Sequence, residues 1–192
     1  MCAVYKLKLK PDGEIIRKIK ERYGEEIAMD YLDAQLFPKS TAPVLGPSRK
    51  IALLRWGFPV SGKSRTVFNA RAESLTQKPM FKSCIQNRCI VPATGFFEWG
   101  EAGGKKQKYE IETDDEVMYF AALFKKFYDS NGEKVFCYTI ITTPPNDEMA
   151  KIHSRMPAIL DAEGQQKWLD PQTDPADILL PYPKSLVISR AE

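Results

Sequence analysis

The chain has 192 residues, of which 43% are apolar and 28% charged, and its formal net charge is +3. This length and composition are typical of one folded domain and exclude a disordered, collagen-like or disulfide-stapled chain, while the charge neither requires nor excludes a nucleic-acid partner. The longest apolar run, residues 117–124, is too short for a membrane helix, and lysines stand where a secretory signal needs apolar residues. We therefore expect a cytoplasmic protein without membrane contact.

The first elements in chain order are a strand and a helix. Tyr5, Leu7 and Leu9 alternate with lysines, which predicts a half-buried strand. Apolar residues at helical spacing then predict an amphipathic helix over residues 15–23, with Asp12 as a candidate cap. Residues 37–48 carry three prolines and a glycine with little periodicity, which predicts an ordered surface loop.

The rest of the chain is rich in predicted strands. They cover residues 51–56, 89–92, 108–112, 117–124 and 135–142. The last two form a predicted hairpin, and two helices follow, over residues 146–152 capped by Asn146 and over residues 162–169 capped by Asp161. The pattern predicts a single domain over residues 1–192, of α+β class, with a strand-rich pseudo-barrel sheet and peripheral helices.

Two sequence patterns resemble ligand sites but lack the neighbouring residues that such sites need. Residues 57–64, GFPVSGKS, match the phosphate-binding loop pattern, but no helical pattern follows and no later strand ends in an aspartate for magnesium. Cys84, Cys89, Cys137 and His153 lack the close pairing of zinc ligands. We expect these cysteines to be buried, reduced thiols, and we expect no metal and no cofactor.

Another set of residues combines groups that do chemistry together. Cys2 follows the initiator Met1, so removal of one residue would expose an α-amine and a thiol on the same residue. Glu98 lies among aromatic residues, whose poor solvation raises a carboxyl pKa toward neutrality. Asn69 and the single histidine, His153, add an amide and a base. The set therefore supplies a nucleophile, an acid, a base and an amide.

These residues lie in motifs that occur together in one family. After Met1-Cys2 come R-W-G at 55–57, N-A-R-A-E at 69–73, G-F-F-E-W at 95–99 and H-S-R-M-P at 153–157. In this combination and order the chain resembles the SOS-response-associated peptidase (SRAP) family, whose members process abasic sites in DNA. The resemblance runs from Cys2 to about Val187 and makes the GFPVSGKS match accidental.

The resemblance implies a covalent capture of single-stranded DNA at an abasic site. Cys2, freed of Met1, would form an imine and then a thiazolidine with the aldehyde of the opened sugar. By similarity, Glu98 moves protons at the amine and sugar, His153 acts on the sugar hydroxyl, and Asn69 hydrogen-bonds near Cys2. The resemblance also implies two kinds of DNA contact. Arg71 and Arg155 would clamp phosphates, and Trp56 and Trp99 would offer stacking surfaces for unpaired bases.

The chain departs from the family pattern at its N-terminus. The family usually begins M-C-G-R, whereas Ala3 and Val4 stand here, so one phosphate anchor is missing. The tail after Val187 is also shorter than in relatives, and either departure can change DNA affinity. The preferred strand geometry and the route of Met1 removal stay open, and we expect a monomer.

Two other functions remain open at this level. The same Cys2, Glu98 and His153 would serve a cysteine peptidase or N-terminal-nucleophile amidohydrolase, acting perhaps only on the bond after Met1. A module that binds single strands without chemistry would use only the arginines and aromatic residues. The leading expectation is an SRAP-type hydrolase or lyase that forms and reverses a DNA–protein crosslink.

Overall fold

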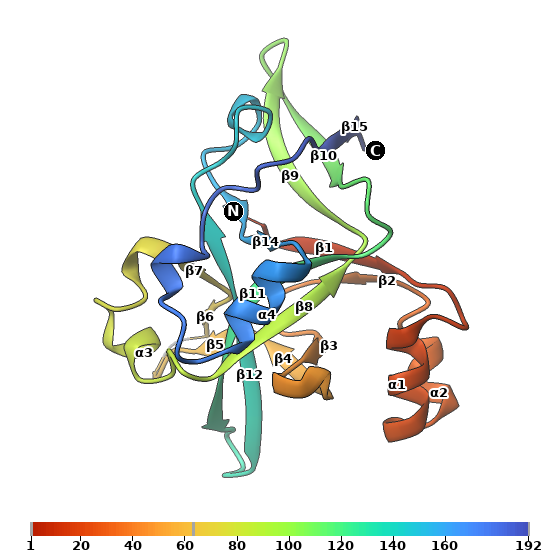
Figure 1. Cartoon of the computed structure of the whole chain (residues 1–192), viewed down its shortest axis with the longest axis vertical. Helices are drawn as coiled ribbons and strands as arrows, with labels where there is room; N and C mark the ends of the chain where they lie inside the picture. The colour runs from red at the N-terminus through yellow and green to blue at the C-terminus, as the bar shows by residue number, and fades with distance from the viewer. Residues whose placement is uncertain (1, 63, 192) are drawn as a thin grey trace.

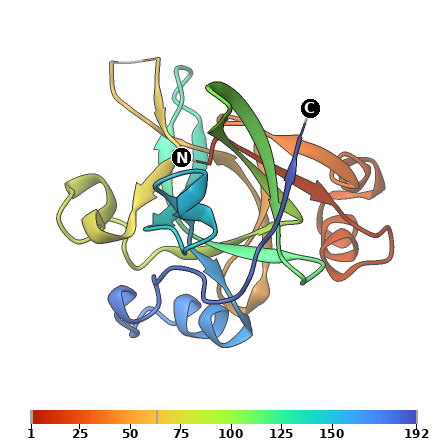
Figure 2. The same cartoon turned by 90° about the horizontal axis from the view of Figure 1, so that it is seen from above.

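Five strands close into a barrel in the computed structural model, which describes residues 2–62 and 64–191. In order around the ring they are β12 (Lys134–Thr143), β4 (Ile51–Trp56), β3 (Thr41–Leu45), β8 (Arg88–Ala93) and β11 (Met118–Tyr128), which pairs again with β12. The β4–β12 pairing is parallel and the others are antiparallel. The ring is visible from above in Figure 2.

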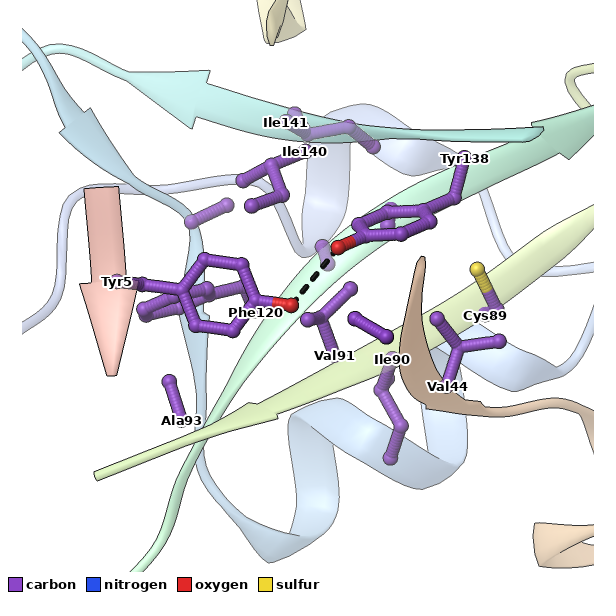
Figure 3. Packing of buried hydrophobic residues seen from close by; sticks show 14 of the residues in the cluster. Tyr5, Val44, Cys89, Ile90, Val91, Ala93, Phe120, Tyr138, Ile140 and Ile141 are labelled. Atoms are coloured by element: carbon purple, nitrogen blue, oxygen red, sulfur yellow. Dashed lines mark hydrogen bonds between the residues drawn. The ribbon is translucent and has the colours of Figure 1, made fainter. Parts of the chain in front are cut away.

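The barrel interior is filled by aromatic and branched side chains. Tyr138 of β12 and Tyr5 share a hydrogen bond of 2.7 Å between their hydroxyl groups, and both side chains are fully buried (Figure 3). The ring of Phe120 packs edge-on against Tyr5 at a centroid distance of 6.1 Å. Pairing the two hydroxyls satisfies polar groups that would otherwise be costly to bury.

A second, antiparallel sheet stands beside the barrel and contains the N-terminal strand (Figure 1). Its order is β15 (Val187–Arg190), β10 (Lys105–Glu112), β9 (Gly95–Ala102), β1 (Val4–Lys8) and β2 (Asp33–Leu36). The chain passes from barrel strand β8 into β9 at Thr94, whose N–H donates to the carbonyl of Lys6 at 2.9 Å. This step joins the two sheets next to the N-terminus.

Short elements complete the fold. The helices are α1 (Glu14–Tyr23), α2 (Glu25–Met29), α3 (Pro79–Lys82) and α4 (Ala162–Leu169). The short strands are β5 (Phe58–Pro59), β6 (Thr66–Val67), β7 (Asn69–Arg71), β13 (Met156–Pro157) and β14 (Ile159–Leu160). The 3-10 turns are η1 (Pro47–Arg49), η2 (Ala72–Ser74), η3 (Met149–Lys151) and η4 (Pro175–Asp177). The helices lie at the periphery of the strands (Figures 1 and 2). The predicted α+β class with a barrel-like sheet is confirmed.

The predicted strands are all present, and the helix ends agree in part. Asp161 caps α4 by accepting from the N–H of Gly164 at 2.8 Å, as predicted. The predicted cap of α1 is wrong, because Gly13 occupies the N-cap position and no side chain caps that helix end. The helix predicted over residues 146–152 is wrong, because only the short turn η3 forms there and its N-cap is Glu148. The Asn146 side chain still accepts from the N–H of Met149 at 3.0 Å.

The loop predicted over residues 37–48 is wrong, because it contains the buried barrel strand β3. Proline normally argues against a strand, since it cannot donate to a ladder. Here Pro43 is paired on one side with Leu53 of β4, whereas the pairing of β3 with β8 lies at Leu45. The proline therefore occupies a position where a missing N–H costs little.

The phosphate-loop motif GFPVSGKS does not form a phosphate loop. The part of it that the structure describes belongs to a small hairpin of β5 and β6, in which Phe58 pairs with Val67. The lysine of the motif, Lys63, lies outside the described residues. A strand rather than a helix follows, so the rejection of a mononucleotide loop on sequence grounds agrees with the structure.

Three further findings concern the cysteines, possible metal ligands and possible membrane spans. All four cysteines are buried and free of disulfides, as expected for Cys84, Cys89 and Cys137. Across residues 2–62 and 64–191, no three His, Cys, Asp or Glu side chains are grouped to hold a metal ion. No helix in that part of the chain is long and apolar enough to span a membrane.

Candidate functional site

Cys2 lies at the entrance to β1, against the middle of β9. The register pairs Val4 with Phe97, which places the residues before Val4 beside Glu98 and Trp99. The Cys2 side chain is fully buried, and its thiol points toward the carbonyl oxygen of Val4 at 3.6 Å. Burial first, and then the negative charge of Glu98, raise the pKa of this thiol, so it is protonated near neutral pH.

Asn69 holds the main chain of Cys2 in place. Its side-chain Nδ2 donates to the carbonyl oxygen of Cys2 at 2.7 Å. Asn69 begins β7, which runs parallel to β12 with Asn69 opposite Ile140. The barrel wall therefore positions Cys2 through one amide, and the hydrogen bond near Cys2 that the resemblance implied for Asn69 is present.

Glu98 is a buried carboxyl group on the inner face of β9. Only 3% of the surface of Glu98 is exposed to solvent. Burial is the largest influence and raises the pKa of Glu98, while the nearby imidazole of His153 acts in the opposite direction. A buried carboxyl with a raised pKa can carry a proton near neutral pH, which suits it to acid and base steps.

His153 follows η3 and reaches the site because β9 carries a glycine there. A Cβ on Gly100 would lie 3.3 Å from the carbonyl oxygen of Ile152, a contact tighter than normal packing. Gly100 and Glu98 are two residues apart and so share one face of β9. The glycine thus lets the segment before His153 lie directly against the strand that carries Glu98.

The main chain of Arg155 orients the imidazole. The Nδ1 atom of His153 lies 3.0 Å from the N–H of Arg155 and 3.2 Å from its carbonyl oxygen. A neutral ring can accept from the first group and a protonated Nδ1 can donate to the second. Either state is held through Nδ1, which directs Nε2 to other partners.

The guanidinium of Arg155 is engaged within the protein. It donates two bonds of 2.9 Å to the carboxylate of Glu73 in η2 and another to the carbonyl oxygen of Thr142 in β12. Its side chain is 12% exposed. The DNA phosphate contact expected for Arg155 stays a prediction. In this structure the guanidinium links the segment that carries His153 to η2 and β12.

The two tryptophans have opposite surroundings. Trp56 is fully buried, stacks on Tyr138 at a centroid distance of 6.3 Å and donates from Nε1 to the carbonyl of Phe68. The expectation that Trp56 offers a stacking surface is therefore corrected. Trp99 is half-buried on the outer face of β9, where Lys106 lies 5.8 Å from its ring centroid. Its role as a stacking surface stays a prediction.

The burial of Trp56 predicts a stability effect. We expect Trp56→Ala to lower the free energy of unfolding by about 3–5 kcal/mol, the usual cost of removing a buried aromatic side chain. Denaturant titration measures this, with Trp99→Ala as the matched control with a smaller loss. Unchanged stability of Trp56→Ala together with weakened DNA binding would show that the ring serves the surface instead.

Sequence reasoning missed several residues around this site. It predicted no strand over residues 95–102, and it assigned no role to Gly100, Glu73 or Lys108. The Nζ of Lys108 in β10 lies 4.7 Å from the ring centroid of Phe97, beside the pair made by Lys106 and Trp99. Three lysines within residues 105–108 were the available signal for this basic and aromatic face. Arg71, at the end of β7, is exposed.

Known proteins resemble most of this chain. The family described as SOS response associated peptidase (SRAP) matches residues 1–190. "Abasic site processing protein YoqW" of Bacillus subtilis (strain 168) is 39% identical over 149 residues, 71% of this chain and 66% of its own length. "Abasic site processing protein HMCES" of Xenopus tropicalis is 32% identical over 174 residues, 69% of this chain.

The chain matches only part of these relatives but nearly all of a solved structure. Its match covers 66% of the Bacillus protein and 52% of the Xenopus protein. A crystal structure of a protein from Bacteroides thetaiotaomicron superposes with a TM-score of 0.83 at 29% identity, covering 100% of this chain and 92% of that one. The barrel with its adjoining sheet is therefore a shared architecture.

Proposed function

The chain belongs to the SOS response associated peptidase (SRAP) family, and we propose on this basis that it processes abasic sites in DNA by capturing them covalently through Cys2. The names of its relatives support abasic-site processing. The observation that carries the chemical proposal is the position of Cys2, whose carbonyl is held by Asn69 beside the buried carboxyl of Glu98. Met1, whose removal the chemistry requires, lies outside the described residues.

The proposed reaction has two bond-forming steps. The α-amine of Cys2 adds to the aldehyde carbon of the ring-opened deoxyribose, and loss of water leaves an imine. The thiol sulfur then bonds to the imine carbon, and the thiol proton passes to the nitrogen. The product is a five-membered thiazolidine that joins protein and DNA. An unperturbed α-amine has a pKa of about 7.7–8.0, so a useful fraction is neutral near pH 7.

Neighbouring residues receive separate roles in this proposal. Glu98 delivers and removes protons at the nitrogen and at the leaving water, which its raised pKa favours. His153, held through Nδ1, acts from Nε2 on the sugar hydroxyl that is released when the ring opens. Asn69 keeps the Cys2 main chain in reach of both.

The state of the Cys2 thiol favours this proposal over a peptidase. A cysteine peptidase attacks through a thiolate whose pKa is lowered by a paired histidine. Here burial and Glu98 raise the pKa of Cys2, and the hydrogen-bond acceptor that the described residues offer the thiol is the carbonyl of Val4. In the proposed reaction the α-amine makes the first bond and the thiol adds only afterwards, to an imine carbon, so the proposal demands less of the thiol as a nucleophile than a peptidase does. Cleavage of the bond after Met1 remains the one peptidase step compatible with the proposal.

One experiment separates the candidate functions. Purified protein is mixed with single-stranded oligonucleotides that differ only in one abasic site, and the products are separated under denaturing conditions. We expect a stable shift with the abasic strand alone. Amide hydrolysis that does not depend on DNA would support a peptidase, and reversible binding that ignores the lesion would support a simple binding module.

Arg71 and Arg155 are both expected to contact DNA phosphates. Arg71→Ala and Arg155→Ala should each reduce the slope of log affinity against log salt concentration by about 0.7, the effect of one lost phosphate contact on a single strand. For Arg155 this requires the guanidinium to exchange Glu73 for a phosphate when DNA binds. Binding titrations between low and moderate salt on an intact oligonucleotide test both variants.

An unchanged slope for Arg155→Ala would contradict its phosphate contact and would mean that the guanidinium stays on Glu73 when DNA binds. The matched variant Glu73→Gln keeps the arginine and removes its partner's charge, so it should strengthen rather than weaken binding if Arg155 reaches a phosphate.

A further inference from the structure

A second cluster of cations lies on the barrel wall, away from Cys2. Three segments converge there on a cavity of about 190 Å³: the turn before β3, strand β4, and the β5–β6 hairpin. They contribute Lys39, Arg55 and Arg65 respectively, all exposed. Tyr128, from the end of β11, is 58% exposed and also lines the cavity. We call this cavity the Arg55 pocket.

The positive charge of the Arg55 pocket is only partly offset by the protein. Among the described residues, no carboxylate forms an ion pair with Lys39, Arg55 or Arg65. One acidic residue, Asp129, also lines the pocket, and its carboxylate accepts from the main-chain N–H groups of Asn131 and Glu133 at 2.8 and 2.9 Å. Three cations against one carboxylate leave an excess of positive charge around the cavity, which favours an anionic ligand.

The segment that resembles a phosphate loop forms one wall of this pocket. Gly57, Pro59 and Ser64 of GFPVSGKS line the cavity together with Arg65 and Thr66. Gly57 has φ +105°, and a Cβ there would lie 2.8 Å from the hydroxyl oxygen of Thr66. The glycine therefore lets the hairpin fold close over the pocket, whose walls carry hydroxyl donors as well as cations. The segment shapes an anion site without being a mononucleotide loop.

The size and place of the pocket indicate which anion it takes. Pockets for whole small molecules are roughly 300–1,000 Å³, so this cavity suits a single phosphate group that belongs to a larger ligand. On β12, Cys137 is opposite Arg55 and Ile140 is opposite Asn69. Three residues of strand span about 10 Å, which places the Arg55 pocket within a few nucleotides of the reaction site.

We propose that the Arg55 pocket binds a backbone phosphate of the single-stranded DNA that flanks the abasic nucleotide, with Tyr128 as an adjacent stacking surface for a base. This inference rests on the proposed function. The pocket would supply a phosphate anchor outside the N-terminal segment, where this chain has Ala3 and Val4 in place of the family's Gly and Arg. Aromatic side chains beside a positive groove are the usual means of holding single strands.

The test compares two triple variants that lose the same charge. Lys39→Gln, Arg55→Gln and Arg65→Gln together empty the pocket of cations, and the control carries Arg17→Gln, Lys20→Gln and Lys167→Gln on helices α1 and α4. Each set of three substitutions takes the formal net charge from +3 to 0. Thermal unfolding of both variants checks that the fold is kept, and affinities for intact DNA are measured over a range of salt concentrations.

For the pocket variant we expect the slope of log affinity against log salt to fall by at least about 0.7 on single-stranded DNA. The control should match the wild type. Equal changes in the two variants would overturn the proposal. So would wild-type DNA binding by the pocket variant alongside loss of adenosine triphosphate binding, which would indicate a mononucleotide site.

The outcomes for the pocket and for the proposed function can be separated. Intact DNA tests the pocket without any crosslinking chemistry. If the wild type fails to crosslink abasic DNA, the proposed function fails, while the salt slope still decides whether the pocket holds a phosphate. If crosslinking succeeds and the slope is unchanged, only the pocket assignment is wrong.

Discussion

Cys2→Ala is expected to abolish the denaturant-stable adduct with abasic DNA while leaving noncovalent binding to single strands nearly unchanged. The methyl group cannot close a thiazolidine ring, and the phosphate contacts lie elsewhere. The loss should be complete on denaturing gels and in intact-mass spectra. Because alanine is smaller than the buried thiol and adds no polar group, the fold should survive the change.

Matched variants separate the thiol from the amine. Cys84→Ala removes another buried thiol and should crosslink like the wild type. Cys2→Ser should form a reversible imine that is trapped only by a reductant. An uncleavable N-terminal extension should abolish both products, because an amide nitrogen has no basic lone pair. A normal yield of stable adduct from Cys2→Ala would rule out the thiazolidine.

Glu98→Gln is expected to slow the reversal of the crosslink by roughly 10²–10⁴ and to slow its formation less. Opening the thiazolidine needs a proton delivered to the ring and water activated at the carbon, and glutamine can do neither. The amide has nearly the shape of the carboxyl, so the change tests proton transfer rather than packing. Release of DNA from purified crosslink over time measures the effect.

The pH dependence gives this prediction a second readout. Burial raises the pKa of Glu98, so the protonated acid persists toward neutral pH and is lost as the pH rises through that raised value. The wild-type reversal rate should therefore fall over that range, and the Glu98→Gln rate should lack this fall. Glu26→Gln, which changes an exposed carboxyl on α2 outside the site, is the matched control. Equal effects of Glu98→Gln and His153→Ala on every step would contradict their separate roles.

Local sequence patterns predicted most of the barrel because its strands are short runs of apolar and β-branched residues bounded by turn residues. The runs that became β4, β11 and β12 carry this signal within a few neighbouring residues. Strand β3 carried it poorly, since its short buried stretch is interrupted by a proline. Whether Pro43 is tolerated depends on which partner strands flank it, and those partners are distant in the sequence.

The sequence by itself determined which chemical groups the protein has: a cysteine at position 2, a carboxyl among aromatic residues, and one histidine. Only the tertiary structure decided how they meet. The amide of Asn69 reaches Cys2 across 67 residues of chain, and Arg155 reaches Glu73 across 82. The same long-range packing buried Trp56 and gathered three cations around the Arg55 pocket. Residue type sets the available chemistry, whereas exposure and partners follow from strand pairing between segments that no local pattern connects.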